Sequence, residues 1–191
     1  MDRKKHRLEA ILIAQKKLAL NPIYLDVETT GMEALDEIIE IAVVDHDASV
    51  LVDSFVKPIG DISPSAYAVH GITEVMIKDA PPWAELWPHV EESLRGRVVG
   101  IYNADFDIRM MEQSHQINQM TWQPPYADQF CIMKLYAQFH GEWNPSKRSY
   151  RWQKLDAARG QCNINIPNTH RAKDDTLLAR EILYYMADQK G

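Results

Sequence analysis

The chain has 191 residues, a formal net charge of −6, 46% hydrophobic residues and 25% charged residues. This composition fits one ordinary globular domain and excludes collagen, low-complexity disorder and a disulfide scaffold. There are two cysteines, and no apolar run approaches the ~20 residues of a membrane helix, so we expect a cytoplasmic protein without a disulfide framework or membrane span.

The charge is distributed unevenly along the chain. Residues 21–133 carry five Lys or Arg against nineteen acids, a net of −14, whereas residues 134–173 carry eight against two acids, a net of +6. An acidic middle beside a basic late segment suits a metal site that adjoins a polyanion track. Random surface charge is an equally open explanation.

The first part of the chain predicts one helix followed by strands. Apolar residues at helical spacing indicate a helix over residues 3–20, which Asn21-Pro22 ends. Apolar runs then predict strands at 23–28, 38–45 and 49–57. Because the turns between these strands are short, we expect an antiparallel meander.

The rest of the chain alternates helices and strands. The expected elements are, in order, helices at 74–80 and 83–95, a buried strand at 98–103, a helix at 104–115, a short strand at 126–130, a helix at 131–139, a polar loop at 141–150, and helices at 153–159 and 174–187. This order predicts an α/β fold in which helices flank a mixed sheet.

A pair of carboxylates lies at the end of the first predicted strand. Residues two apart on a strand project from the same face, so Asp26 and Glu28 are expected to lie together. Two close carboxylates repel each other unless a proton or cation separates them, and such oxygen ligands suit Mg²⁺ or Mn²⁺. An exposed acidic strand end is the alternative, although Thr-Thr-Gly and the apolar lead-in favour a site.

A third carboxylate follows the predicted buried strand. On a helix, Asp107 shares a face with Met110 and Met111, which directs it toward the sheet, where a lone carboxylate is costly. Asp105 falls on another face and fits an ordinary first-turn acid favoured by the helix dipole. The same dipole role remains open for Asp107.

The last predicted helix supplies a fourth carboxylate and a histidine. Asp175 lies in line with an apolar stripe, whereas Asp174 lies about 100° around the helix. His170 is five residues before Asp175 and is expected in the preceding loop. A loop imidazole beside carboxylates suits a general base, because its pKa lies near neutrality. An ordinary surface histidine is the alternative.

Three segments in this order resemble the motifs of the DEDDh 3′–5′ exonucleases, DnaQ-like members of the RNase H-like superfamily. They are Asp-Val-Glu-Thr-Thr-Gly at 26–31, Asn-Ala-Asp-Phe-Asp at 103–107 and His-Arg-Ala-Lys-Asp-Asp at 170–175. The resemblance implies a single RNase H-like domain over 22–191 with a mixed five-stranded sheet. Residues 1–21 are then an N-terminal helical extension.

Outside these three motifs, one further segment resembles the family and two places differ from it. Residues 68–73, Ala-Val-His-Gly-Ile-Thr, are similar to a loop common in the family, which we interpret as mainly structural. Many members have His where this chain has Tyr102, a change expected to alter side-chain contacts near the site. Residues 141–151 match no family motif.

The resemblance implies two divalent cations, Mg²⁺ or Mn²⁺, held by Asp26, Glu28, Asp107 and Asp175. Asp26 would bridge both ions, Glu28 and Asp175 would assist the first, and the second would reach Asp107. Two such ions bind both the attacking and the leaving oxygen of a phosphoryl displacement. His170 would take the proton from the attacking water, and nucleoside 5′-monophosphates would leave from 3′ ends.

Further residues are candidates for substrate binding. The resemblance implies that the terminal nucleotide contacts Thr29, Thr30, Met32 and Phe106, although a role in the core is equally open for Phe106. A more distant part of the strand is expected to follow the basic residues Lys147, Arg148, Arg151 and Lys154, with bases stacked on Tyr150 and Trp152. The alternative is that Trp152 and Leu155 anchor a helix to the core while the basic residues are solvated.

The polymer and the partners stay open at this stage. We expect single-stranded DNA or mismatched 3′ ends as substrate. A 3′–5′ exoribonuclease of the RNase T or oligoribonuclease type, an endonuclease on a similar sheet, or a non-catalytic polymerase-associated binding module are the alternatives. Proofreading would require a polymerase in trans, because 191 residues hold no polymerase domain. The protein could be a monomer or a homodimer.

Overall fold

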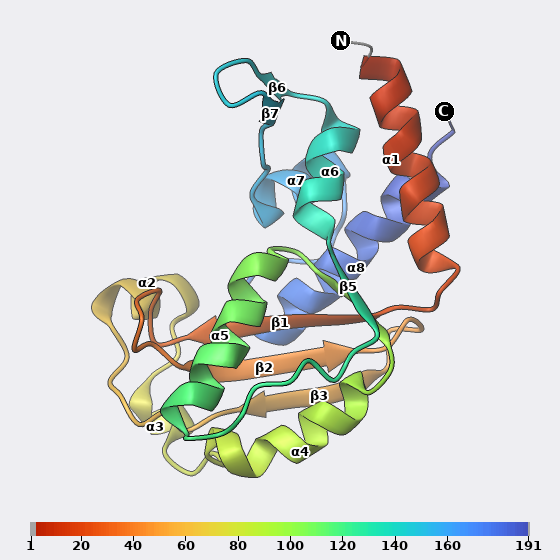
Figure 1. Cartoon of the computed structure of the whole chain (residues 1–191). Coiled ribbons are helices and arrows are strands. Elements are labelled where there is room, and N and C mark those ends of the chain that lie inside the picture. Colours follow the sequence, from red (N-terminus) through yellow and green to blue (C-terminus); the bar gives the residue numbers. More distant parts are fainter. Residues whose placement is uncertain (1–2, 191) are drawn as a thin grey trace.

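A mixed five-stranded sheet forms the centre of the computed structural model, which describes residues 3–190 (Figure 1). The strand order is β3-β2-β1-β4-β5, with β1–β2 and β2–β3 antiparallel and β1–β4 and β4–β5 parallel. The strands are β1 (Ile23–Thr29), β2 (Ile38–Val44), β3 (Val50–Phe55), β4 (Val98–Ile101) and β5 (Asp128–Cys131). The predicted meander and the mixed sheet are therefore confirmed.

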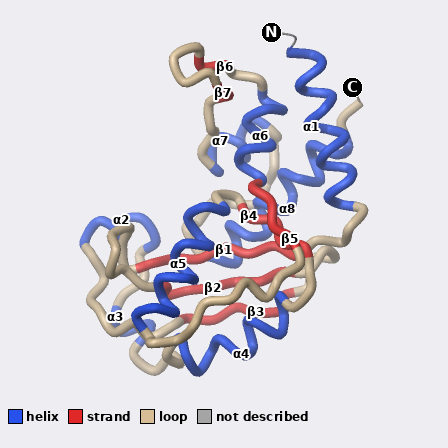
Figure 2. The backbone as a smooth tube through the Cα atoms, viewed as in Figure 1, coloured by secondary structure: helices blue, strands red, loops and turns tan. Residues whose placement is uncertain are grey.

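Helices cover both faces of this sheet (Figure 2). One face packs against α4 (Trp83–Leu94) and α5 (Ala104–Ile117). The other face packs against α1 (Arg3–Leu18), α6 (Ile132–His140), α7 (Leu155–Gln161) and α8 (Ala172–Asp188). Two short helices, α2 (Pro64–His70) and α3 (Glu74–Ile77), lie near the end of β1. Among residues 3–190, no helix has both the length and the apolar character needed to cross a bilayer.

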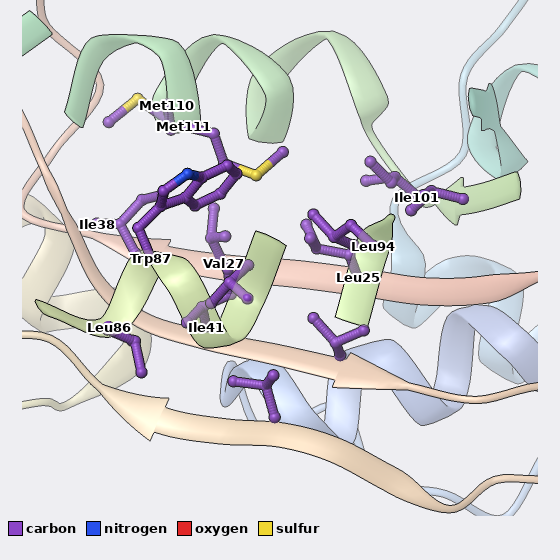
Figure 3. Close-up of a cluster of buried hydrophobic side chains, with 14 of the residues drawn as sticks. Leu25, Val27, Ile38, Ile41, Leu86, Trp87, Leu94, Ile101, Met110 and Met111 are labelled. Atoms are coloured by element: carbon purple, nitrogen blue, oxygen red, sulfur yellow. The ribbon is translucent and has the colours of Figure 1, made fainter. Parts of the chain in front are cut away.

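The alternation of side chains along β1 decides which layer meets the acidic residues. Ile23, Leu25 and Val27 belong to the core cluster that includes α4 and α5, and Leu25 and Val27 lie among its side chains in Figure 3. Tyr24 belongs to the other cluster, with α1, α6 and α8. Since residues two apart share a face, Asp26 and Glu28 project on the Tyr24 side, toward the layer that contains α8.

The N-terminal helix is part of the second core cluster. Ala10, Ile11 and Ala14 are buried among residues of α6 and α8. The apolar stripe of this helix thus packs on the protein's own core. Leu8, Leu12, Ile13 and Leu20 of the same segment stay exposed.

Two segments differ from the sequence-based expectations. Residues 64–70 form a helix rather than part of a loop, because Ser63 caps it by accepting from the Ala66 N–H and Gly71 ends it with a φ of 67°. Within the expected loop at 141–150, a small hairpin forms from β6 (Trp143–Asn144) and β7 (Ser149–Tyr150). Both features are short and depend on local hydrogen bonds rather than on a periodic apolar pattern.

The contact of α1 with the core predicts a clear difference between two of its isoleucines. Ile11 is 1% exposed and Ile13 is 40% exposed. We expect Ile11→Ala to lower the free energy of unfolding by about 2–4 kcal/mol, through lost burial and a cavity. A domain of this size then loses very roughly 4–16 °C in Tm. Calorimetry should find Ile13→Ala within about 2 °C of the unchanged protein; equal effects would contradict the docking of α1.

Candidate active site

The four predicted carboxylates converge at the end of β1. Asp26 is influenced electrostatically by Asp107, Glu28 and Asp175 together. Ligand atoms of Glu28, His170 and Asp175 all lie within 4.8 Å of one another. The structure thus brings β1, the first turn of α5 and the first turn of α8 to one place, as the sequence predicted.

Asp107 reaches the cluster because β4 is shorter than β1. The parallel pairing of these strands ends at Leu25 and Ile101, so the N–H of Val27 lies beyond the ladder. The Oδ1 atom of Asp107 accepts a hydrogen bond from this N–H at 3.2 Å. Asp107 is 2% exposed, so the bond lies in the protein interior. It satisfies a buried backbone donor and at the same time orients the Asp107 carboxylate.

His170 lies in the loop before α8, as expected from its position. Its backbone has a φ of 52°, a left-handed conformation uncommon for a residue other than glycine. The imidazole Nδ1 lies 3.9 Å from Oδ2 of Asp175, and half of the side chain is exposed. Asn168, with its amide nitrogen directed toward Asp175, donates to both carboxylate oxygens at 3.1 and 3.2 Å. The loop therefore presents a solvent-accessible imidazole beside a buried carboxylate.

Burial raises the pKa of every carboxyl group in the cluster, and neighbouring carboxylates raise it further for Asp26, Glu28 and Asp175. The pKa of Asp26 lies well above its usual range, first because of burial and then because of Asp107, Glu28 and Asp175. Burial, followed by the neighbouring carboxylates, raises the pKa of Glu28 to about 9. Burial raises the pKa of Asp107 and of Asp175 to about 7. At Glu28 these effects outweigh the opposing influence of the Arg171 guanidinium on the pKa.

This donor set fits divalent cations. It supplies carboxylate oxygens without sulfur, the ligand type that Mg²⁺ and Mn²⁺ prefer. The raised pKa values reflect burial and neighbouring negative charge, and a bound cation reverses this local electrostatic balance. The cluster is accordingly a candidate metal centre on its own chemistry.

A fifth carboxylate, Glu40, was not identified from the sequence. It lies directly opposite Glu28 in the β1–β2 register and is 3% exposed. Its oxygens accept from Arg171 Nε at 3.1 Å, from another guanidinium nitrogen at 2.6 Å and from the Ala172 N–H at 3.0 Å. This ion pair fastens the start of α8 to β2. One signal was available: a single Glu within the apolar run Ile-Ile-Glu-Ile-Ala-Val-Val.

The residues predicted to contact a terminal nucleotide divide into two groups. Thr29, Met32 and Phe106 line a cavity of about 270 Å³ next to Glu28. Thr30 does not line it: its hydroxyl donates to Asp36 Oδ1 at 2.7 Å and accepts from the Glu37 N–H. Thr30 therefore shapes the loop after β1, whereas the other three face the open space.

His70, in the segment interpreted as structural, also lines this cavity. Its Nδ1 accepts from the Ile72 N–H at 2.9 Å, so Nε2 carries the proton and donates to the carbonyl of Thr29 at 3.2 Å. Burial lowers the pKa of this imidazole. A neutral His70 thus fixes the end of β1 beside the cavity.

Lys147, Arg148 and Arg151 are not brought to the carboxylates. Lys147 and Arg148 belong to the turn of the β6–β7 hairpin, and Arg151 follows it; the hairpin projects beside α6, away from the sheet (Figure 1). Asp105 pairs with Lys134 at 2.6 Å, and Asp174 accepts from Thr169 at 2.7 Å. Both acids have partners outside the cluster, in line with their predicted faces.

Comparisons with known proteins agree with this arrangement. Residues 23–183 match the RNase T family, described as exonuclease. The uncharacterized exonuclease CP81 of Escherichia phage 186 is 31% identical over 185 residues, covering 91% of this chain and 92% of that protein. DNA polymerase III subunit epsilon of Escherichia coli is 30% identical over 171 residues, which cover 84% of this chain and 67% of the subunit.

A solved structure has a similar fold. Exonuclease X in complex with 5′ overhanging duplex DNA superposes with a TM-score of 0.61 at 26% identity. The match covers 86% of this chain and 90% of that one. By contrast, the chain spans 11% of the PolC-type DNA polymerase III of Thermotoga maritima. The shared unit is therefore a whole domain, which in that polymerase is one part of a much longer protein.

The repulsion within the cluster predicts how stability depends on pH without divalent cations. The pKa values of Glu28 and Asp175 in the folded protein, about 9 and about 7, lie above those of an unfolded chain. The folded protein then binds more protons than the unfolded one, so the unfolding free energy falls as pH rises through this range. In EDTA, thermal melts should give a lower Tm at pH 8 than at pH 5.

Divalent cations should reverse this loss of stability. Millimolar Mn²⁺ is expected to raise Tm at pH 8, because a ligand that binds only the folded state stabilises it. Glu28→Gln should weaken both the pH dependence and the response to Mn²⁺, whereas Asp174→Asn is the matched control and should retain both. A Tm that rises with pH in EDTA would contradict the account of the cluster.

The buried ion pair of Glu40 predicts unequal effects at two neighbouring basic residues. Arg171→Met leaves the Glu40 carboxylate buried without its partner and should cost roughly 3–5 kcal/mol of unfolding free energy. Lys173, which pairs with Asp53 in a more exposed position, serves as the control. Lys173→Met is expected to cost less than about 1 kcal/mol. Denaturant unfolding measures both, and equal losses would argue against an anchoring role for Glu40.

Proposed function

The chain belongs to the RNase T family of exonucleases and is a 3′–5′ exonuclease, and we propose that it acts on single-stranded or mismatched 3′ ends of DNA with two divalent cations. The observation that carries the proposal is the convergence of four carboxylates from three elements next to an open cavity. Such a set has no structural benefit by itself, since burial and repulsion make it costly.

Asp26, Glu28, Asp107 and Asp175 would hold the cations in this proposal. When bound, two divalent cations supply charge stabilisation for the attacking and the leaving oxygen of the phosphodiester. The chain's own contribution is to fix the carboxylates: the Val27 N–H orients Asp107, and Asn168 orients Asp175. These groups need not reorganise when substrate enters.

His170 would accept the proton of the attacking water. Its imidazole is half exposed, so water reaches it, and its Nδ1 lies 3.9 Å from Oδ2 of Asp175, beside the proposed metal ligands. Arg171 follows His170 in the chain, and its ion pair with Glu40 holds the loop against β2. The backbone at His170 is thus held in place, while its imidazole ring stays accessible to solvent.

The terminal nucleotide would occupy the cavity beside Glu28. Thr29 and His70 line this cavity with Glu28, and Met32 and Phe106 supply apolar surface for a sugar or a base. A cavity with a few polar groups in a largely apolar lining is typical of small-ligand sites. Binding in this place would direct the adjacent phosphate toward the carboxylates.

DNA is the polymer that the comparisons favour. Exonuclease X was solved with duplex DNA, and the epsilon subunit belongs to a DNA polymerase. Both are proteins that this chain resembles, and the choice of DNA for this chain rests on that likeness. An exoribonuclease of the RNase T type is the second candidate, because the matched family carries that name.

The function is tested on 5′-labelled 20-mers of DNA and RNA with Mg²⁺ or Mn²⁺. We expect a ladder that shortens from the 3′ end, faster on DNA, and absent in EDTA. Asp175→Asn should lower the rate by about 10³-fold or more, the effect of losing several kcal/mol of charge stabilisation. Asp174→Asn is the matched control and should keep the rate. Cleavage of a circular strand, or faster RNA cleavage, would favour the other candidates.

The general base is tested separately. His170→Ala should reduce kcat by about 10²–10⁴-fold, the usual contribution of a positioned base. Thermal melts should still show stabilisation by Mn²⁺, since the imidazole is not one of the proposed metal ligands. His89→Ala, on the exposed surface of α4, is the control for loss of a histidine. An unchanged kcat in His170→Ala would remove this residue from the mechanism.

A further inference from the structure

The basic residues between 134 and 173 fall into two groups. Four of them each make an ion pair with an acid: Lys134 with Asp105 at 2.6 Å, Arg159 with Asp156 at 2.9 Å, Arg171 with Glu40 at 2.6 Å and Lys173 with Asp53 at 2.7 Å. The other four lie at 147, 148, 151 and 154. Within residues 3–190, only Arg151 of this second group has an acidic partner, Glu142. The unneutralised positive charge is therefore concentrated at 147–154.

An exposed tryptophan lies within this basic segment. Trp152 is 62% exposed, so it does not anchor α7, a role that falls to the partly buried Leu155 in the second core cluster. Together with Lys147, Tyr150 and Arg151, Trp152 lines an open hollow of about 390 Å³. A large aromatic face beside positively charged side chains is the combination that binds single-stranded nucleic acid, because bases stack on the ring while phosphates meet the charges.

The segment is continuous with the carboxylate cluster. At one side, the Tyr102 hydroxyl at the end of β4 donates to the carbonyl of Gln153 at 3.0 Å. At the other, Asn168 accepts from the N–H of Asp156 at 3.2 Å while its amide nitrogen faces Asp175. Residues 153–156 thus connect the hairpin to the cluster, and Lys154 lies within this connection.

The N-terminal helix supports the hairpin. His6 Nδ1 is hydrogen-bonded to the hydroxyl of Tyr150, and the Tyr150 ring packs edge-on against Trp143 with centroids 5.3 Å apart. Gln138 of α6 donates to the carbonyl of His6 at 2.9 Å. α1 precedes the family match at 23–183, so the hairpin is held by a part of the chain outside that match.

From these observations we infer that residues 143–154 form a second nucleic-acid contact, which binds the single strand on the 5′ side of the nucleotides at the carboxylate cluster. Lys147, Arg148 and Lys154 contact phosphates, and Trp152 stacks on a base. The inference rests on the proposed function only for the placement of the 3′ end. Its consequence is that affinity depends on strand length, since a short strand cannot reach the hairpin.

The test compares binding of short and long DNA strands without cleavage. Fluorescence anisotropy in EDTA gives the Kd of labelled 3-mer and 20-mer single strands. Lys147→Ala/Arg148→Ala/Lys154→Ala removes three charges from the segment, and Lys16→Ala/Lys57→Ala/Lys190→Ala removes three exposed charges elsewhere as the matched control. We expect Kd for the 20-mer to rise about 10-fold or more in the first variant only. Its plot of log K against log salt should be shallower by about 2, the loss of three phosphate contacts.

Two further variants test the aromatic contact and the support from α1. Trp152→Ala should raise the Kd for the 20-mer by about 5–150-fold, the effect of one lost stacking contact. His6→Ala should raise it as well, since the hairpin loses its bond to α1. Circular dichroism melts confirm folding of each variant. For every variant, cleavage of a dinucleotide should stay at the unchanged rate.

The outcomes separate this inference from the proposed function. If the triple variant binds the 20-mer as tightly as the unchanged protein while cleavage persists, the inference is overturned and the exonuclease proposal stands. The unchanged protein could instead cleave nothing, yet bind the 20-mer more tightly than the 3-mer and lose that difference in the triple variant. The second contact then stands and the proposed substrate is wrong. Preference of the hairpin for an acidic peptide over the oligonucleotide would also overturn the inference.

Discussion

Repulsion among buried carboxylates at the end of β1 is the interaction around which this protein is organised. A folded chain gains nothing from placing Asp26, Glu28, Asp107 and Asp175 together, because burial raises the pKa of each. The arrangement persists because rigid elements leave these side chains no other place. β1 projects two of them to one face, and the first turns of α5 and α8 contribute one each.

The sheet supplies that rigidity through features that are themselves far from any reaction. β4 ends early, so a backbone donor of β1 remains available to Asp107. β2 carries Glu40 opposite Glu28, and this buried carboxylate holds Arg171 and thereby the loop with His170. Glu40 thus adds one more negative charge near the cluster, and its guanidinium partner compensates that charge locally. The loop gains a fixed anchor without adding net charge there.

Sequence patterns were sufficient for the parts of the site that depend on periodicity. The period of two along β1 predicted the shared face of Asp26 and Glu28, and the helical period predicted that Asp175 turns inward while Asp174 does not. Glu40 and His70 were missed because their roles depend on a cross-strand register and on a short capped helix. Neither feature leaves a repeating pattern of apolar residues in the sequence. The β6–β7 hairpin was missed as an element for the same reason, although its charge was noted.

The five tryptophans of the chain divide into two optical populations. Trp83, Trp87 and Trp122 surround His115 in the core under α4 and α5, with ring centroids 4.4 to 5.7 Å apart. The remaining two, Trp143 and Trp152, belong to the hairpin region on the opposite layer. Trp83 and Trp87 are buried, whereas Trp152 is 62% exposed, so a solvent quencher is expected to reduce the emission of Trp152 first. A single spectrum of this protein therefore carries separate reports from its core and from its outermost loop.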